Sequence, residues 1–138
     1  YSHGVIYDFV NKLLKDKNHL FILGNGKQKK SYLDVKDGVN GVLKLSELNE
    51  MKCSIFNLGH TEIIDVNNLA KIICKQMNLK DVEFKFSGGE RGWKGDSPLV
   101  HLDISKAVKY GWSPTINIET AICNTVNYLL SDSKNLYR

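Results

Sequence analysis

The sequence predicts a small α/β domain, because apolar stripes at helical spacing alternate with short apolar runs that are typical of strands. The 138 residues suffice for one hydrophobic core, and the hydrophobic fraction of 42% and the charged fraction of 25% are ordinary for a globular protein. The chain begins with a helical stripe, whereas a dinucleotide-binding unit begins with a strand and a glycine-rich turn. Residues 1–138 are therefore expected to form a single domain, the second lobe of a longer protein.

The first half of the chain is expected to contain two helices and two strands. Apolar residues at helical spacing predict the helices, although Gly38 and Gly41 weaken the second one. Short apolar runs beside the turn residues of "GNGK" predict the strands. In order, these elements are a helix at 5–14, a strand at 20–23, a turn at 24–27, a strand at 31–35 and a helix at 39–48.

The second half is expected to contain three more helices, each beginning after a capping residue. Asp and Asn side chains accept hydrogen bonds from the first free N–H groups of a helix. Asp65, Asp103 and Asn117 therefore mark the starts of these three helices. The run "SIFNL" indicates a buried strand, and "VEFKF" alternates as a strand does. In order, these elements are strand 54–58, the helix after Asp65, strand 82–86, a short helix from Asp103 to Val108, and a helix from Asn117 to Leu130.

Composition argues against several classes of function. The net charge of +4 is mild and the lysines are scattered, so no nucleic-acid partner is expected. No apolar stretch is long enough to span a membrane, and no membrane partner is expected. Cys53, Cys74 and Cys123 lie far apart without metal-ligand spacing, so no metal site is expected. Reduced thiols on helix faces point to a cytoplasmic location.

The stretch "GGERGWKGDSP" at 88–98 is the strongest candidate for a binding loop. Arg91 and Arg138 are the two arginines among 19 Lys and Arg residues, so Arg91 is the single internal arginine. Its planar guanidinium suits a phosphate or carboxylate, Lys94 adds a point charge, and Asp96 can accept from a hydroxyl or hold an arginine. The loop is interpreted as a grip on an anionic, hydroxyl-rich ligand. The alternative is a surface loop whose glycines serve turns.

Two other motifs are interpreted as chance matches. "YLDVK" places Tyr32 and Lys36 four residues apart, as in the acid–base pair of short-chain dehydrogenases, but that pair requires a helix and this segment is of strand type. No G-x-G-x-x-G follows a strand, so no cofactor-binding or catalytic residue is assigned. Lys29 and Lys30 point to opposite faces of an extended segment, so at most one faces a given site.

The order of these pieces resembles the C-terminal, substrate-binding part of the extended short-chain dehydrogenase/reductases, the NAD-dependent epimerase/dehydratase family, and especially its UDP-glucose 4-epimerase-like members. The segment 20–37, LFILGNGKQKKSYLDVKD, is similar to the family pattern I-x-G-D-G-x-Q-x-R-D/S-F/Y-x-Y/H-V-x-D. The segment 88–114 matches the one that ends in D-x-S-K-A…L-G-W-x-P. The resemblance covers nearly the whole chain, and also includes GVIYDFVNKLL at 4–14, FNLG at 56–59, IIDVNNLAKII at 63–73 and IETAICNTVNYL at 118–129.

The resemblance implies which residues bind the substrate. Gly4 and Val5 lie where the family contacts the diphosphate and base, and the backbone of Phe21 and Leu23 lies where it meets the uracil. The loop residues Arg91 and Asp96 would hold the phosphates and the ribose, and Lys30 stands in place of a strand arginine. The substrate-binding set is therefore Gly4, Val5, Phe21, Leu23, Lys30, Arg91 and Asp96. The chain departs from the family at Lys30, at Asn25 in the "G-D-G" turn, at Asp34 and in the spacing of the loop.

The resemblance also implies a function that this chain cannot perform alone. The family's NAD site and its catalytic Tyr and Lys lie in an N-terminal Rossmann lobe that these 138 residues do not include. The chain is interpreted as the UDP-sugar-binding part of an NAD-dependent 4-epimerase or dehydratase of carbohydrate metabolism. The alternative is a stand-alone sugar-nucleotide-binding or regulatory module without catalysis. Apolar surface on the helix 5–14 and strand 20–23 is expected to dock the N-terminal lobe or a second copy in a homodimer.

Overall fold

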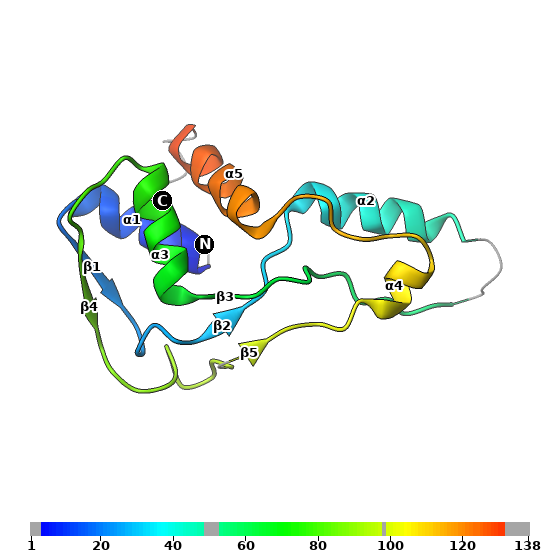
Figure 1. Ribbon diagram of the computed structural model, residues 1–138, viewed down its shortest axis with the longest axis horizontal. Helices are drawn as coiled ribbons and strands as arrows, with labels where there is room; N and C mark the ends of the chain where they lie inside the picture. Colours follow the sequence, from blue (N-terminus) through cyan, green and yellow to red (C-terminus); the bar gives the residue numbers. More distant parts are fainter. Residues whose placement is uncertain (1–3, 49–52, 98, 132–138) are drawn as a thin grey trace.

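The computed structural model describes residues 4–48, 53–97 and 99–131, which form an elongated α/β structure (Figure 1). Three helices, α1 (Val5–Lys15), α3 (Val66–Gln76) and α5 (Ile118–Ser131), gather at one end of the molecule. The helices α2 (Val35–Ser46) and α4 (Ser105–Lys109) lie at the other end. Short strands connect the two ends. Each end has a hydrophobic cluster of its own.

The larger core lies where α1, α3 and α5 cover two parallel strands. These strands are β1 (His19–Ile22) and β4 (Glu83–Phe86), and Leu20 lies opposite Phe84 in their register. The apolar side of α1 packs into this core against α3 and α5, whereas Phe21 and Leu23 of the strand expected at 20–23 remain exposed. The most deeply buried side chains here are Val10, Leu13, Leu20, Ile22, Leu69, Ile73, Ile122 and Val126.

The middle of the molecule is a three-stranded sheet of two-residue strands. Its order is β3 (Ile64–Asp65), β2 (Lys29–Lys30), β5 (Leu99–Val100), with β2 antiparallel to β3 and parallel to β5. Lys30 therefore pairs in register with Ile64 on one side and with Val100 on the other. This pairing brings the segment before β5 beside the central strand, although about 65 residues separate them in sequence.

The strand expected at 31–35 is wrong, because a helix cap ends the extended segment. The strand β2 lies two residues earlier, and α2 already begins at Val35. Asp34 is the N-cap: its Oδ1 accepts from the backbone N–H of Lys36 at 2.9 Å, and its Oδ2 accepts from Asn124 Nδ2 at 2.9 Å. A buried capping carboxylate with two donors outweighs the strand preference of "SYLDV".

The buried strand expected at 54–58 is also wrong in this chain. The segment has no ladder partner among the described residues, and Ile55 is 81% exposed. Its polar contacts are to α4 and to the segment just before it: Lys106 Nζ donates to Ile55 O at 2.8 Å, and Asn57 Nδ2 donates to Asp103 O at 3.1 Å. An apolar run becomes a buried strand only where another strand pairs with it.

The expected helix starts after Asp65 and Asn117 are confirmed. Asp65 Oδ1 accepts from the N–H of Asn68 at 2.8 Å, and Asn117 Oδ1 accepts from the N–H of Thr120 at 2.8 Å. The start of α4 needs a correction of one residue. Its N-cap is Ile104, while the Asp103 carboxylate still accepts from the N–H of Ser105 at 2.9 Å.

The arm formed by α2 and α4 packs around a second, smaller cluster. Leu45, Ile104, Ala107 and Trp112 are its buried members. Gly41 on α2 lies directly against the Trp112 ring: an added Cβ would be 2.8 Å from Trp112 Cε2. Glycine is needed there for close packing, and it is the reason why the apolar stripe of α2 is interrupted.

We expect Gly41→Ala and Gly38→Ala to have opposite effects on stability. A methyl group at 41 would overlap Trp112, whereas at 38 it would lie 3.6 Å from Leu33 Cδ2, an ordinary contact. Gly38→Ala should raise the free energy of unfolding by about 0.5–1 kcal/mol, the helix preference of alanine over glycine. Gly41→Ala should lower it by about 1–3 kcal/mol through overpacking.

Urea denaturation of the two variants measures both effects, and each serves as the control for the other. Equal stabilisation by both substitutions would contradict the close packing of α2 on Trp112.

Candidate ligand-binding site

The candidate site is a cavity of about 670 Å³ at the junction of the larger core and the middle sheet. Its walls come from α1, the end of β1, the segment around β2, and the loop between β4 and β5. Five of the seven residues expected to bind substrate line it, namely Gly4, Val5, Leu23, Lys30 and Asp96. The other lining residues are Asp8, Phe9, Ile22, Gln28, Tyr32, Val66, Gly92 and Trp93.

An ion pair between Lys30 and Asp96 closes one wall of the cavity. Lys30 Nζ donates to Asp96 Oδ1 at 2.6 Å and to the carbonyl oxygen of Ser97 at 3.0 Å. The other carboxylate oxygen of Asp96 accepts from the N–H of Gly92 at 3.1 Å. The Asp96 carboxylate thus connects two positions within the glycine-rich loop, and it also joins this loop to the central strand of the sheet.

The pKa of Asp96 reflects this environment. Burial by itself raises the pKa, but the Lys30 hydrogen bond, the Gly92 N–H and the charges of Lys30 and Arg91 outweigh it, so the pKa is lowered. The side chain is 9% exposed, so the carboxylate stays ionised with its charge largely balanced inside the wall. Asp96 therefore contacts Lys30 rather than the arginine that the sequence suggested as its partner.

Gly24 lets the β1 end and the loop approach each other. It has φ +80°, in the left-handed region, and an added Cβ would overlap the Gln28 amide and lie 3.1 Å from the backbone of Arg91. Its N–H donates to Ser87 Oγ at 2.8 Å, and its carbonyl accepts from the N–H of Gly88 at 3.1 Å. The turn at 24–27 therefore holds the beginning of the loop against β1.

Phe21 and Arg91, the two remaining expected binding residues, lie outside the cavity lining. Phe21 is exposed on β1, and its carbonyl oxygen accepts from Lys12 Nζ at 3.1 Å. The side chain of Arg91 is exposed and makes no hydrogen bond or ion pair within the described part of the chain. Its charge is nevertheless close enough to lower the pKa of Asp96. Arg91 thus lies outside the cavity lining, next in sequence to Gly92, which is part of that lining.

Two polar residues of the lining were not expected from the sequence. Gln28 is buried, and its Nε2 donates to the carbonyl oxygen of Leu23 at 3.1 Å. Tyr32 is half-buried and lies in the segment between β2 and α2. Its position in "YLDVK" was the one available signal. Tyr32 lies before α2 and Lys36 within its first turn, so no helix aligns the pair.

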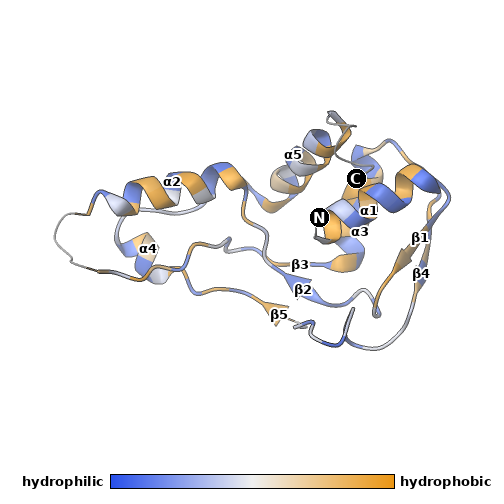
Figure 2. Cartoon of the chain, turned by 180° about the vertical axis from the view of Figure 1, so that it is seen from behind, coloured by the Kyte–Doolittle hydropathy of each residue, from blue (hydrophilic) through white to orange (hydrophobic). Residues whose placement is uncertain are grey.

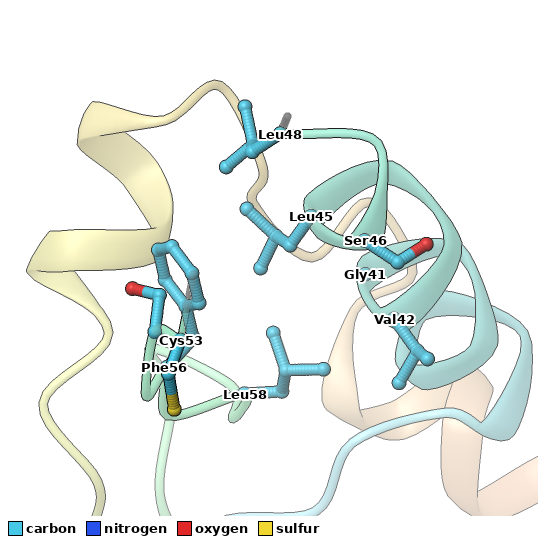
Figure 3. Close-up of a pocket in the computed structure, with 9 residues that line it drawn as sticks. Gly41, Val42, Leu45, Ser46, Leu48, Cys53, Phe56 and Leu58 are labelled. Atoms are coloured by element: carbon cyan, nitrogen blue, oxygen red, sulfur yellow. The ribbon is translucent and has the colours of Figure 1, made fainter. Parts of the chain in front are cut away.

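A second cavity of about 390 Å³ lies beneath α2 (Figure 3). Leu45, Leu48 and Leu58 point toward its interior, with Phe56 on the opposite side and Cys53 at its edge. None of the residues expected to bind substrate lines it. Among the described residues, its lining carries no Lys, Arg, Asp, Glu or His.

Within the described residues, no three His, Cys, Asp or Glu side chains are grouped so as to hold a metal ion. Likewise, none of the described helices has both the length and the apolar character that crossing a bilayer requires.

The chain is similar over most of its length to nucleotide-sugar epimerases. A Methanocaldococcus jannaschii protein named as a candidate UDP-glucose 4-epimerase is 29% identical over 95% of this chain. A UDP-galactose 4-epimerase structure is 30% identical over 94% of the chain, with a TM-score of 0.79. A Thermotoga maritima UDP-glucose 4-epimerase solved with UDP-glucose is 26% identical over 95%, also with a TM-score of 0.79.

These matches cover only part of each relative. The chain spans 40% of the M. jannaschii protein, 41% of the UDP-galactose 4-epimerase and 40% of the T. maritima enzyme. The fold also matches a Bacillus cereus UDP-glucuronic acid 4-epimerase solved with UDP-glucuronic acid and NAD, at a TM-score of 0.75, 21% identity, 96% of this chain and 40% of that one. No family model matches the chain.

We expect Asp96→Asn to loosen the wall of the cavity. The variant replaces an ion pair by a hydrogen bond from the Lys30 ammonium group to a neutral acceptor and should lower the free energy of unfolding by about 1–2 kcal/mol. Because the pKa of Asp96 is lowered, its contribution is present above the ordinary Asp pKa and is lost as the pH falls through the lowered value. Urea denaturation at neutral and acidic pH measures this difference.

Glu119→Gln is the control, because the Lys75–Glu119 pair, with a distance of 3.5 Å, lies on the exposed surface of α3 and α5. An exposed pair of this kind contributes about 0.5 kcal/mol or less. Equal effects of the two variants would mean that Asp96 does not hold the loop.

Proposed function

We propose that this chain, which matches the C-terminal part of the NAD-dependent epimerase/dehydratase family of extended short-chain dehydrogenase/reductases, is the nucleotide-sugar-binding part of a UDP-glucose 4-epimerase-like enzyme. The observation that carries the proposal is the cavity between the core and the middle sheet. It gathers Gly4, Val5, Leu23, Lys30 and Asp96 from segments up to about 90 residues apart. The T. maritima relative, solved with UDP-glucose, supports this assignment.

The chemistry of the cavity suits a ligand that carries phosphates and hydroxyl groups. Arg91 at its edge offers a planar fork of donors, which matches two phosphate oxygens at once. Lys30 offers one further donor beyond its bonds to Asp96 and Ser97. Trp93 presents an exposed ring at the wall, and a ring of this kind covers the flat face of a base or sugar.

The chemical step is assigned to a part of the protein outside these residues. In the proposed enzyme, NAD would take a hydride from the sugar and return it to the other face of the keto-sugar, while a tyrosine would take the hydroxyl proton. The present chain has no dinucleotide fingerprint for NAD. Its role would be to hold the nucleotide and to set which sugar face meets the cofactor.

We propose that an N-terminal Rossmann lobe of the same protein docks on α2 rather than on α1. The outward face of α2 carries Val35, Val39, Val42 and Leu43, all exposed, and these residues line an apolar groove of about 370 Å³. Figure 2 shows hydrophobic residues along α2 in orange. The segment 54–58, which has no ladder partner in the described part of the chain, lies at the same end of the molecule (Figure 1). An apolar helix face beside an unpaired extended segment fits the edge of a sheet that another lobe supplies.

Substitutions at Arg91 test the proposed function. If the loop holds a diphosphate, Arg91→Ala should cost about 1.5–3 kcal/mol of binding energy for UDP, which is roughly tenfold or more in Kd. Arg91→Lys should restore only part of the loss, because the charge remains while the fork is lost. Lys94→Ala, at an exposed point charge in the same loop, is the control and should have a smaller effect.

Calorimetric titration of UDP into these proteins, each in full-length form, gives the affinities. The same Kd for Ala, Lys and Arg at position 91 would refute a phosphate contact by this residue.

The substitution Val39→Glu tests the docking surface. Val39 is 54% exposed, so in the isolated chain the change should alter the free energy of unfolding by no more than about 0.5 kcal/mol. In a longer protein with the further lobe, the glutamate would be buried without a partner and should cost about 2 kcal/mol or more. Tyr128→Glu on α5, at the other end, should be neutral in both forms. If Val39→Glu leaves the free energy of unfolding of the longer protein unchanged, this face of α2 is exposed to solvent there.

A further inference from the structure

The chain contains two Asn–Gly pairs, and the structure places them in different surroundings. Asn25 and Gly26 lie in the turn between β1 and β2, whereas Asn40 and Gly41 lie within α2. Asparagine is a chemically labile residue, because the backbone nitrogen of the following residue can attack its side-chain carbon. A following glycine presents no side chain that would block the approach. The backbone around each pair then decides whether the attack occurs.

The turn holds Asn25 in a position from which this reaction can start. Asn25 Oδ1 accepts from the backbone N–H of Lys27 at 2.9 Å, so the side chain folds back along its own backbone and Cγ lies beside the Gly26 nitrogen. Reacting groups that the fold already holds together react faster. Within the described residues, neither the Gly26 N–H nor Asn25 Nδ2 forms a hydrogen bond, so neither the attacking nor the leaving nitrogen is held by another partner.

The helix protects Asn40 from the same attack, although this residue is exposed. In an α-helix the N–H of each residue donates to the carbonyl four residues before it, so the Gly41 N–H points to the carbonyl oxygen of Asp37 and away from the Asn40 side chain. The Trp112 ring packs directly on this turn of α2, because an added Cβ at Gly41 would be 2.8 Å from Trp112 Cε2. Attack on Asn40 therefore requires local unfolding of α2, which costs free energy that the turn does not require.

We propose that the pair Asn25–Gly26 is a site of spontaneous deamidation in the native protein and that Asn40–Gly41 is protected. The Gly26 nitrogen bonds to Asn25 Cγ, the bond from Cγ to Nδ2 breaks, and ammonia leaves with the proton that the Gly26 nitrogen has lost. Water then opens the cyclic imide. Cleavage between the ring nitrogen and Cγ gives aspartate, and cleavage on the main-chain side gives isoaspartate, in which the chain continues through Cγ and is one carbon longer.

The two products differ in their effect on the turn. An aspartate keeps the hydrogen bond from the Lys27 N–H, because a carboxylate oxygen accepts as the amide oxygen does. Isoaspartate lengthens the main chain before Gly26, which is buried against Phe86 and whose carbonyl oxygen accepts from the N–H of Asn67 at 3.1 Å. Isoaspartate therefore displaces the turn that holds the beginning of the glycine-rich loop against β1. The reacting pair itself lies outside the cavity lining, and the reaction involves no bound ligand.

Incubation of the native full-length protein at neutral and mildly alkaline pH, followed by peptide mapping with mass spectrometry, tests the proposal. Deamidation at Asn25 should be about tenfold or more faster than at Asn40, a ratio that corresponds to about 1.4 kcal/mol of opening free energy in α2. The rate should rise with pH, because the attacking nitrogen must lose its proton. In denaturing urea the two rates should become similar, since both pairs then lie in an unfolded chain. Asn25→Gln, whose longer side chain moves the amide carbon away from the Gly26 nitrogen, is the control and should abolish the reaction at 25 without changing that at 40.

A native rate at Asn25 that does not exceed the rate at Asn40 overturns the proposal, because the turn would then protect its pair as well as the helix does. Thermal unfolding tests the consequence for the turn. Once the products are separated by chromatography, the isoaspartate form should have a lower Tm than the starting protein, whereas Asn25→Asp should have the same Tm. An unchanged Tm of the isoaspartate form would show that the longer main chain does not displace the turn.

Discussion

The arrangement of the two ends of the molecule depends on the hydrogen bonds made by the buried carboxylate of Asp37. It is 2% exposed and accepts from the N–H and Oγ1 of Thr115 at 2.9 and 2.8 Å and from the N–H of Ile116 at 2.9 Å. Burial alone would raise the pKa of Asp37, but these hydrogen bonds outweigh it and the pKa is lowered. The backbone carbonyl of Asp37 accepts from Trp112 Nε1 at 3.2 Å. One residue thus joins α2 to the segment that leads into α5 and the larger core.

The candidate site lies where this connected frame meets the sheet. Because the sheet is made of two-residue strands, its register is set by contacts outside the ladder, and the Lys30–Asp96 pair is one of them. The same pair places a positive and a negative group at a single wall. A ligand therefore meets a nearly neutral wall there, and the free positive charge lies at the edge with Arg91.

The sequence predicted the helices better than the strands, for a physical reason. Helix capping and apolar periodicity are local, so the starts after Asp65 and Asn117 could be found without a structure. Strand formation requires a partner, and the run at 54–58 has none among the described residues. Position 35 shows the same limit: Asp34 caps a helix with help from Asn124, which lies 90 residues away in sequence. No pattern near residue 34 contains that contact.

The sequence by itself determined the α/β class, the amphipathic helices and the identity of the glycine-rich loop with its single arginine, because these depend on neighbouring residues. The resemblance of its motifs also indicated five of the residues that line the cavity. Only the tertiary structure decided that Asp96 pairs with Lys30 rather than with Arg91, and that Gln28 Oε1 and the Tyr32 hydroxyl form no hydrogen bond within the described residues. Those facts depend on which side chains the packing of distant segments brings within about 3 Å of one another. Periodicity and spacing along the sequence do not predict hydrogen bonds between such segments.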